Sequence, residues 1–353
     1  MEKQTTKKTE TGNSPKKNRK LIWQIPLLVL LIVGTIFIIR EQQSTPYQQN
    51  AGLVFGTQYH ITYQSNDDLQ KEIEAELKKV DEALSTFNEH SIISLINKNQ
   101  DVTTNNLFEE VFTKAQHISE ETNGAFDITV APLVNLWGFG FKTGEKPSKE
   151  KIDSLMKYIG YQKISCENGK VKKAHPAVML DCSAIAKGYG CDVVARLFQQ
   201  KGIKNFMIEI GGEIITSGNS PKRLPWKIGV TKPVDDSLNV DQEQQTILNV
   251  TDMAMATSGN YRNFYYKGGK KYAHTINPKT GYPVQHSLLS ATVLAKDCAT
   301  ADAYATAFMV MGIDHAKSVL DSHPELMAYF IYSAPNGELM TWHSPSMDGK
   351  IGK

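Results

Sequence analysis

The distribution of apolar and polar residues divides the 353-residue chain into a short N-terminal part and a long body. Residues 21–39, LIWQIPLLVLLIVGTIFII, are apolar apart from one Gln and one Thr, and a basic residue flanks each end. A helix needs about 20 apolar residues to cross the hydrocarbon core of a bilayer. The pattern therefore predicts one transmembrane anchor over 21–39, between a polar tail at 1–20 and a polar stalk at 40–51.

Two alternatives to this anchor fit the pattern less well. A cleaved signal peptide has a shorter apolar core followed by small residues, whereas this run has 19 residues and continues as REQQ. A lipoprotein would need a cysteine just after the run, but the first cysteine is Cys166. Residues 1–20 hold seven Lys or Arg against two Glu, which predicts a cytoplasmic tail and a body on the opposite side of the membrane.

The body, from residue 52 to 348, shows segments of period two between segments of helical period. Strands are predicted over 55–64, 178–180, 205–210 and 288–295, with a hairpin over 262–275. Helices are predicted over 67–84, 106–121, 148–158, 184–200 and 298–311. Because helices and strands interleave irregularly, the pattern favours a single α+β domain over a regular doubly wound sheet.

Charge and cysteine content narrow the possible partners. The formal net charge is +2, and residues 1–20 alone carry +5, so the rest of the chain carries about −3. A slightly acidic body argues against nucleic acid as a partner. The four cysteines show neither CxxC spacing nor a nearby His cluster, which argues against zinc. Most lie in apolar runs and are interpreted as small buried side chains rather than as disulfides.

The segment ATADAYATAFMVMG contains the first candidate for chemistry. Asp302 and Thr306 are four residues apart, so on a helix they share one face. A carboxylate and a hydroxyl are hard oxygen ligands of the kind that Mg²⁺ binds together with water and substrate phosphates. The same pair also fits an ordinary helix with a capping Asp and a back-bonded Thr.

The segment LDCSAIAKGYGCD, residues 180–192, places small residues where a strand would lead into a helix. The N-terminus of a helix binds phosphate through its free N–H groups, and Lys187 would add positive charge. The segment does not match the P-loop pattern. A tightly packed strand–helix junction is the alternative interpretation.

His274 lies at the end of the predicted hairpin, just before the tight turn NPKTG. Imidazole suits proton transfer near neutral pH, although a structural role explains a single histidine equally well. In GAFD, Phe126 could pack against a flat ring and Asp127 could meet its polar edge. An N-cap with apolar packing is the alternative for that segment.

Taken in order, eight segments resemble the ApbE family, the FAD:protein FMN transferases. They are FGTQY, LSTFNEHSIISLIN, GAFDITVAPLVNLWGFG, LDCSAIAKGYGCDVVA, EIGGEI, TSGNYRNF, HTINPKTGYP and ADAYATAFMVMG. The resemblance covers about residues 52–345. It implies a T-fold-related α+β catalytic domain with a cleft for FAD, and transfer of FMN to a Thr or Ser of a target protein with release of AMP.

By position, the resemblance also assigns roles to individual residues. It implies that Mg²⁺ is held by Asp302, Thr306 and the backbone carbonyl of Ala184. It implies that FAD is contacted by Phe55, Phe87, Ala125, Phe126, Asp127, Asp181, Lys187 and Ile276. His274, or alternatively Asp302, would take the proton from the attacking hydroxyl.

Three positions depart from the family's usual pattern. Asn277 stands where the family turn H-x-x-D-P has a carboxylate, and Ala305 stands where some members have a further acidic metal ligand. Lys187 stands where some members have an acidic residue. Because Ala305 provides no carboxylate, the expected metal site depends more on Asp302, the phosphates and water.

The resulting prediction is an Mg²⁺-dependent FAD:protein FMN transferase. Its expected location is the bacterial inner membrane, with a single span and the catalytic domain on the extracytoplasmic, periplasmic side. Its expected partners are membrane-associated redox proteins that carry the acceptor hydroxyl. Two other functions use the same residues: cleavage of FAD by water to FMN and AMP, and flavin binding without catalysis.

Overall fold

A computed structural model of the chain describes residues 19–139, 147–233, 244–260, 264–267 and 270–352. The chain divides into two compact units, Met1–Pro46 and Tyr47–Lys353. The second unit begins at Tyr47, within the segment 40–51 that was expected to form a stalk.

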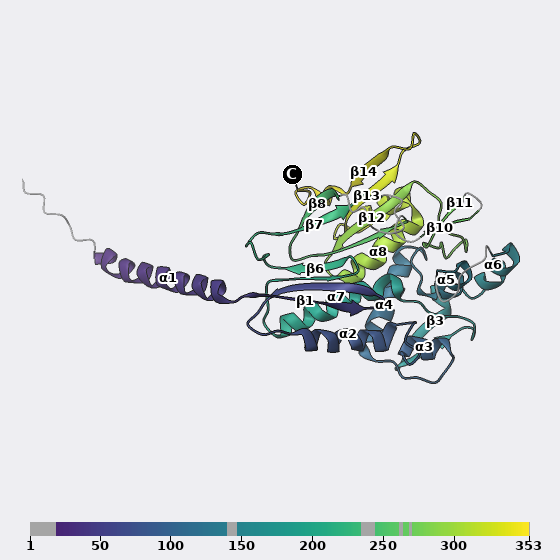
Figure 1. The fold of residues 1–353 in the computed structure, drawn as a ribbon, viewed down its shortest axis with the longest axis horizontal. Helices are drawn as coiled ribbons and strands as arrows, with labels where there is room; N and C mark the ends of the chain where they lie inside the picture. Colours follow the sequence, from purple (N-terminus) through teal and green to yellow (C-terminus); the bar gives the residue numbers. More distant parts are fainter. Residues whose placement is uncertain (1–18, 140–146, 234–243, 261–263, 268–269, 353) are drawn as a thin grey trace, which may run out of the picture. The chain divides into compact units, whose positions relative to one another are not determined.

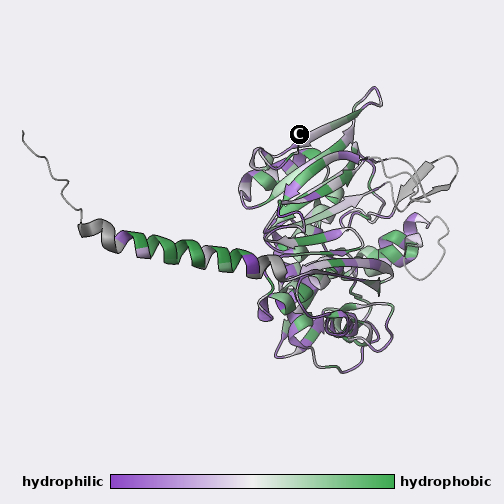
Figure 2. Cartoon of the chain, turned by 60° about the vertical axis from the view of Figure 1, so that its left-hand side comes forward, coloured by the Kyte–Doolittle hydropathy of each residue, from purple (hydrophilic) through white to green (hydrophobic). Residues whose placement is uncertain are grey.

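The first unit contains one helix, α1, which spans Arg19–Ser44 in the described part of the chain. Its large apolar side chains between Ile25 and Ile39 are exposed. Figure 2 colours most of this helix as hydrophobic. Among the described residues, no helix is both long enough and apolar enough to cross a membrane. The start of the run 21–39 and the whole of the tail 1–20 lie outside the described side chains, so the anchor stays a prediction.

The second unit is built on an antiparallel sheet (Figure 1), which has eight strands in the described residues. In spatial order these are β1 (Tyr47–Val54), β2 (Thr57–Gln64), β5 (Phe206–Ile210), β6 (Glu213–Ser217), β9 (Ala254–Gly259), β12 (Leu288–Ala295), β13 (Met327–Ser333) and β14 (Leu339–His343). Every neighbouring pair is antiparallel. The α+β prediction is confirmed.

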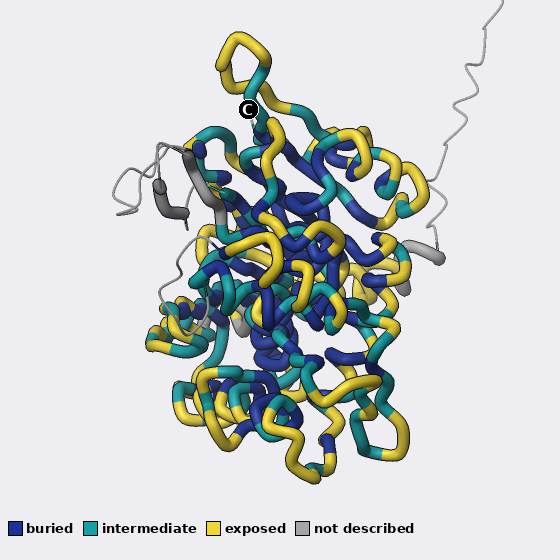
Figure 3. The backbone as a smooth tube through the Cα atoms, turned by 90° about the vertical axis from the view of Figure 1, so that its right-hand side faces the viewer, coloured by how far each residue is buried: buried dark blue, intermediate teal, exposed yellow. Residues whose placement is uncertain are grey.

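Helices cover one face of the sheet. The described helices of this unit are α2 (Gln70–Leu84), α3 (Ile92–Asn97), α4 (Asn106–Glu121), α5 (Ala131–Trp137), α6 (Lys149–Met156), α7 (Ser183–Gln200), α8 (Cys298–Met311) and α9 (Ile313–Ser322). The side chains of α2, α7 and α8 form two apolar clusters with that face. Figure 3 shows this buried interior surrounded by exposed loops.

A smaller hairpin, β7 (Trp226–Thr231) with β8 (Gln244–Val250), contributes to a third apolar cluster on the opposite face. Alternation along β6 explains why both faces are apolar, because Ile214 belongs to this third cluster and Ile215 packs on the helix side. The other described elements are the hairpins β3 (Ile164–Glu167) with β4 (Lys170–Lys173) and β10 (Phe264–Lys267) with β11 (Lys270–Ala273), and three 3₁₀ turns at Ile128–Val130, Tyr161–Lys163 and Pro345–Met347.

Two predicted segments differ from the structure. The stalk expected over 40–51 is helical up to Ser44 and then enters β1, whose residues pair with β2 along its whole length. Its polar residues are compatible with a strand because β1 is an edge strand. Residues 178–180, expected as the end of a strand, do not form a strand in the structure. There the side chain of Asn97 bonds both backbone groups of Leu180, at 2.7 and 2.9 Å, and replaces the sheet.

Candidate active site

The described residues enclose a cavity of about 880 Å³ between the helices and the end of the sheet. This volume is in the range of small-molecule sites. Its lining includes Phe87, Ala125, Phe126, Asp127, Asp181, Ala184, Lys187, His274, Ile276, Asp302 and Thr306. The structure therefore brings together all of the predicted site residues except Phe55. Phe55 lies in the β1–β2 turn with a φ of 52° and packs against Gly190.

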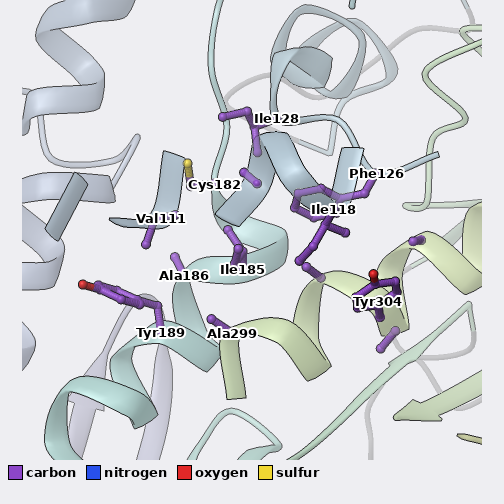
Figure 4. Close-up of a cluster of buried hydrophobic side chains, with 14 of the residues drawn as sticks. Val111, Ile118, Phe126, Ile128, Cys182, Ile185, Ala186, Tyr189, Ala299 and Tyr304 are labelled. Atoms are coloured by element: carbon purple, nitrogen blue, oxygen red, sulfur yellow. The ribbon is translucent and has the colours of Figure 1, made fainter. Parts of the chain in front are cut away.

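The close crossing of α7 and α8 forms one wall of this cavity. A Cβ on Gly188 would lie 2.4 Å from the carbonyl oxygen of Cys298, so only glycine allows the two helices to approach this far. At the same point the N–H of Gly188 donates to Oδ2 of Asp302 over 3.1 Å. Figure 4 shows the packing on this crossing, where Ile185 and Ala186 from α7 lie near Ala299 from α8.

Three charged side chains meet on this wall. Nζ of Lys187 lies 3.9 Å from Oδ2 of Asp302 and 3.7 Å from Oε1 of Glu213. Burial raises the pKa of Asp302, against the opposing effects of Lys187 and the Gly188 N–H. Burial alone would lower the pKa of Lys187, but the two carboxylates outweigh it and raise that pKa. The site thus keeps an ammonium group in close contact with Asp302.

Asp302 and Thr306 both line the cavity, one turn apart on α8. The hydroxyl of Thr306 also lies 3.1 Å from that of Ser258 on β9. The described residues contain no group of three or more His, Cys, Asp or Glu side chains that could hold a metal by themselves. One carboxylate, one hydroxyl and the nearby Ala184 segment instead fit Mg²⁺, which takes few protein ligands and keeps water and phosphate oxygens.

Asp127 lines the cavity but is already bonded within the protein. Its Oδ1 accepts from the N–H and the hydroxyl of Thr129, and its Oδ2 accepts from the N–H of Tyr161 over 2.8 Å. Burial raises its pKa despite these bonds. The N-cap alternative for this segment is therefore realised, with Asp127 as N-cap, while Ala125 and Phe126 form the buried floor beside it.

His274 lines the cavity directly after β11. Its ring makes an edge contact with Phe139, at a centroid distance of 6.4 Å. The turn that follows is organised by Asn277, whose Oδ1 accepts from the N–H of Lys279 over 2.8 Å and whose carbonyl accepts from the N–H of Gly281. Asn277 is not one of the described residues that line the cavity, so its departure from the family pattern affects the turn and not the cavity wall.

Some lining residues were not singled out from the sequence. Glu213, Thr257 and Ser258 line the cavity from β6 and β9. Glu213 belongs to the segment EIGGEI, which the resemblance includes but to which it assigns no role. Their side chains enter the site only through the antiparallel neighbours β6 and β9, and no local spacing reveals that arrangement. An α+β fold whose cavity gathers a buried carboxylate, an ammonium group and an imidazole has the groups that are typical of an enzyme active site.

Comparison with known proteins agrees with this class. The model of the ApbE family matches residues 55–330. An FAD:protein FMN transferase of Haemophilus influenzae is 38% identical over 326 residues, which are 88% of this chain and 93% of that protein. The FAD:protein FMN transferase of Escherichia coli K12 is 32% identical over 339 residues, which are 90% of this chain and 95% of that protein.

Solved structures give the same result. The flavin transferase ApbE from Vibrio cholerae superposes with a TM-score of 0.76 and 34% identity, covering 86% of this chain and 98% of that one. The apo flavinyl transferase ApbE from Pseudomonas stutzeri gives a TM-score of 0.78 and 30% identity, covering 88% and 98%. This chain belongs to the ApbE family and is a transferase.

Another buried carboxylate, Asp192 on α7, holds the start of α8. It accepts from the N–H of Cys298 over 2.7 Å and from the N–H of Ala299 over 2.9 Å. Burial, together with the charge of nearby Asp297, raises the pKa of Asp192 from 3.8 to about 7. Because α8 carries Asp302, this contact helps to position the cavity wall.

The raised pKa of Asp192 predicts a pH-dependent stability. Between about pH 4 and 7 the folded protein keeps a proton on Asp192 that the unfolded chain releases, so this contribution to the unfolding free energy falls as pH rises. The full contribution is about 4 kcal/mol. Asp192→Asn, which does not titrate, is expected to be less stable than the parent at pH 5 and to approach or exceed it at pH 8.

Urea denaturation from pH 5 to pH 8 measures this difference. Asp67→Asn, which changes an exposed carboxyl before α2, serves as the matched control and should follow the parent at every pH. A constant difference between Asp192→Asn and the parent across this range would contradict the prediction.

Proposed function

We propose that this chain transfers FMN from FAD to a Ser or Thr hydroxyl of a target protein in an Mg²⁺-dependent reaction that releases AMP. The observation that carries the proposal is the meeting of Asp302, Thr306, Lys187 and His274 in one cavity, in a chain whose relatives are named FAD:protein FMN transferases. Phosphoryl transfer depends on positioning and on stabilising charge on oxygen, and these groups supply both.

The proposed reaction forms one bond and breaks one. The acceptor hydroxyl oxygen attacks the phosphorus on the FMN side of the pyrophosphate, and the bond from that phosphorus to the bridging oxygen breaks. AMP leaves with the bridging oxygen. His274 takes the hydroxyl proton, with Asp302 as the alternative base, and Lys187 offers an ammonium group to the phosphate oxygens. Bound Mg²⁺ would be held by Asp302, Thr306 and the carbonyl of Ala184, and supplies positive charge at the phosphates.

Mass spectrometry of candidate acceptors tests this proposal. The full-length chain is incubated with FAD, Mg²⁺ and membrane redox proteins that carry accessible Ser or Thr residues. The expected result is an acceptor that gains one covalently bound FMN, with an equal amount of AMP. Free FMN and AMP without an adduct would instead identify a hydrolase, and FAD that stays intact would identify a flavin-binding protein.

We also propose that the chain is anchored in the bacterial inner membrane by residues 21–39, with the catalytic unit on the periplasmic side. The length of the apolar run, the seven preceding basic residues and the exposed apolar side chains of α1 support this. Such an anchor would keep the enzyme beside membrane-bound acceptors.

Protease treatment of intact spheroplasts tests the anchor. The catalytic unit should remain in the membrane fraction after a salt wash and be degraded by protease added from outside. Recovery in the soluble fraction, or protection from that protease, would contradict the proposed anchoring or orientation.

A further inference from the structure

Glu213 is a buried charged residue that lines the cavity and has no role in the proposed reaction. Its side chain is 6% exposed, against 3% for Asp302 and 28% for Lys187. A buried carboxylate is costly unless a charge partner compensates it. The Lys187 ammonium group lies between the two carboxylates, at 3.7 Å from Glu213 and 3.9 Å from Asp302. The Lys187 ammonium group therefore contacts both carboxylates, and the formal charges of these three side chains sum to −1.

Two backbone features hold Glu213 in this position: the turn that precedes it and a hydrogen bond to its carbonyl group. Gly211 and Gly212, with φ angles of 63° and 104°, form the β5–β6 turn just before it. Its backbone carbonyl accepts from the thiol of Cys191 on α7 over 3.3 Å. Since Ile214 points to the opposite face of the sheet, alternation along β6 directs Glu213 toward α7 and Lys187.

We propose that Glu213 is a positioning residue that holds the Lys187 ammonium group beside Asp302. The ammonium group then acts as the counter-cation of Asp302 in the substrate-free site. A divalent cation bound together with the substrate's phosphates would be held by Asp302, and Lys187, still held by Glu213, would then face the phosphate oxygens. This inference rests on the proposed function only for the identity of the substrate as FAD.

The summed formal charge of Asp302, Glu213 and Lys187 sets the expected order of metal affinity. This sum is −1 in the parent, −2 in Lys187→Gln and 0 in Glu213→Gln. It is −1 again in the double variant that carries both substitutions. Lys187→Gln should therefore bind a divalent cation most tightly, Glu213→Gln most weakly, and the double variant like the parent. One charge at this distance is worth at least roughly tenfold in affinity for a divalent ion.

Titration of Mn²⁺ alone into the flavin-free full-length proteins, followed by the EPR signal of free Mn²⁺, measures this order directly. Glu213→Asp, which keeps the charge, and Glu213→Gln, which keeps the shape, form the matched pair. A positioning charge requires the Asp variant to bind Mn²⁺ like the parent and the Gln variant to bind at least roughly tenfold more weakly. A purely structural role would make the isosteric Gln variant the milder change. Thermal melting of each variant confirms that it is folded.

Steady-state kinetics provide a second readout. Glu213→Gln should raise the KM for FAD more than it lowers kcat, because Lys187 would then pair with Asp302 alone instead of being held toward the phosphates. Equal Mn²⁺ affinity in the parent, the two single Gln variants and the double variant, including no binding in any of them, would overturn the inference. If the order of affinities holds but no protein forms an FMN adduct, the proposed function fails and the inference stands.

Discussion

Asp302→Ala is expected to lower the rate of FMN transfer by roughly a thousandfold or more, equivalent to about 4 kcal/mol of transition-state stabilisation. Asp302 is the carboxylate that α8 contributes to the cavity wall, and Thr306 on the same helix face supplies only a neutral hydroxyl. Without Asp302, Mg²⁺ would have no anionic protein ligand from α8, and Lys187 would pair with Glu213 alone. The rate of FMN incorporation into an acceptor at saturating Mg²⁺ measures the effect.

Two variants make this experiment specific. Asp302→Asn keeps the shape of the side chain and removes its charge, so it should lose nearly as much activity as the Ala variant. Asp314→Ala removes an exposed carboxylate from α9, outside the cavity, and should retain the parent rate. Since burial raises the pKa of Asp302, its ionised form is costly to the fold, and Asp302→Asn should remain folded by thermal melting. Full activity of Asp302→Ala at saturating Mg²⁺ would contradict the assignment of Asp302 as a ligand of Mg²⁺.

The elements predicted best from sequence are those whose ends carry their own signals. The helix over Asn106–Glu121 begins at Asn105, whose side chain accepts from the N–H of Phe108, and ends before Asn123 and Gly124, which both have positive φ. The helix over Cys298–Met311 is capped by Asp297 in the same way. Such capping bonds involve residues only a few positions apart, so the local sequence is sufficient to locate them.

Segments that depend on distant partners were predicted less well. Tyr47–Val54 contains three consecutive polar residues, and only its pairing with β2 makes it a strand. Residues 178–180 are apolar but do not form a strand, and the side-chain amide of Asn97 bonds the backbone of Leu180 in place of a strand partner. A pattern of apolar residues predicts that a segment is buried. It does not show whether the backbone of that segment bonds a neighbouring strand or a polar side chain.

The candidate site also combines features that the local sequence predicts with features that depend on distant residues. The i, i+4 spacing of Asp302 and Thr306 predicts their shared face, and the structure confirms that both line the cavity. Glu213 lies 89 positions before Asp302, and the two meet Lys187 only because β6 packs under the α7–α8 crossing. Charged residues that meet only through tertiary packing have no characteristic separation along the chain, so the sequence does not reveal their contact.

The second large effect is expected at His274, where His274→Gln should slow FMN transfer by about 10²- to 10⁴-fold, the usual contribution of a general base. The Gln side chain keeps hydrogen-bonding capacity and a similar reach, but it cannot accept a proton near neutral pH. His274 lies on the cavity wall next to Ile276, with its ring against Phe139. The loss should therefore appear in kcat, while the affinity for FAD changes little.

Transfer rates and FAD binding measured side by side separate the two candidate bases. His315→Gln, which changes an exposed histidine on α9, is the matched control and should equal the parent in both measurements. If His274→Gln transfers FMN within about twofold of the parent rate, the proton goes elsewhere, because loss of a general base costs at least about a hundredfold. Asp302 would then be the base, and the carboxylate would both bind the metal and accept the proton. A large loss in kcat with intact FAD binding assigns the two tasks to two residues: Asp302 at the phosphates and His274 at the incoming hydroxyl.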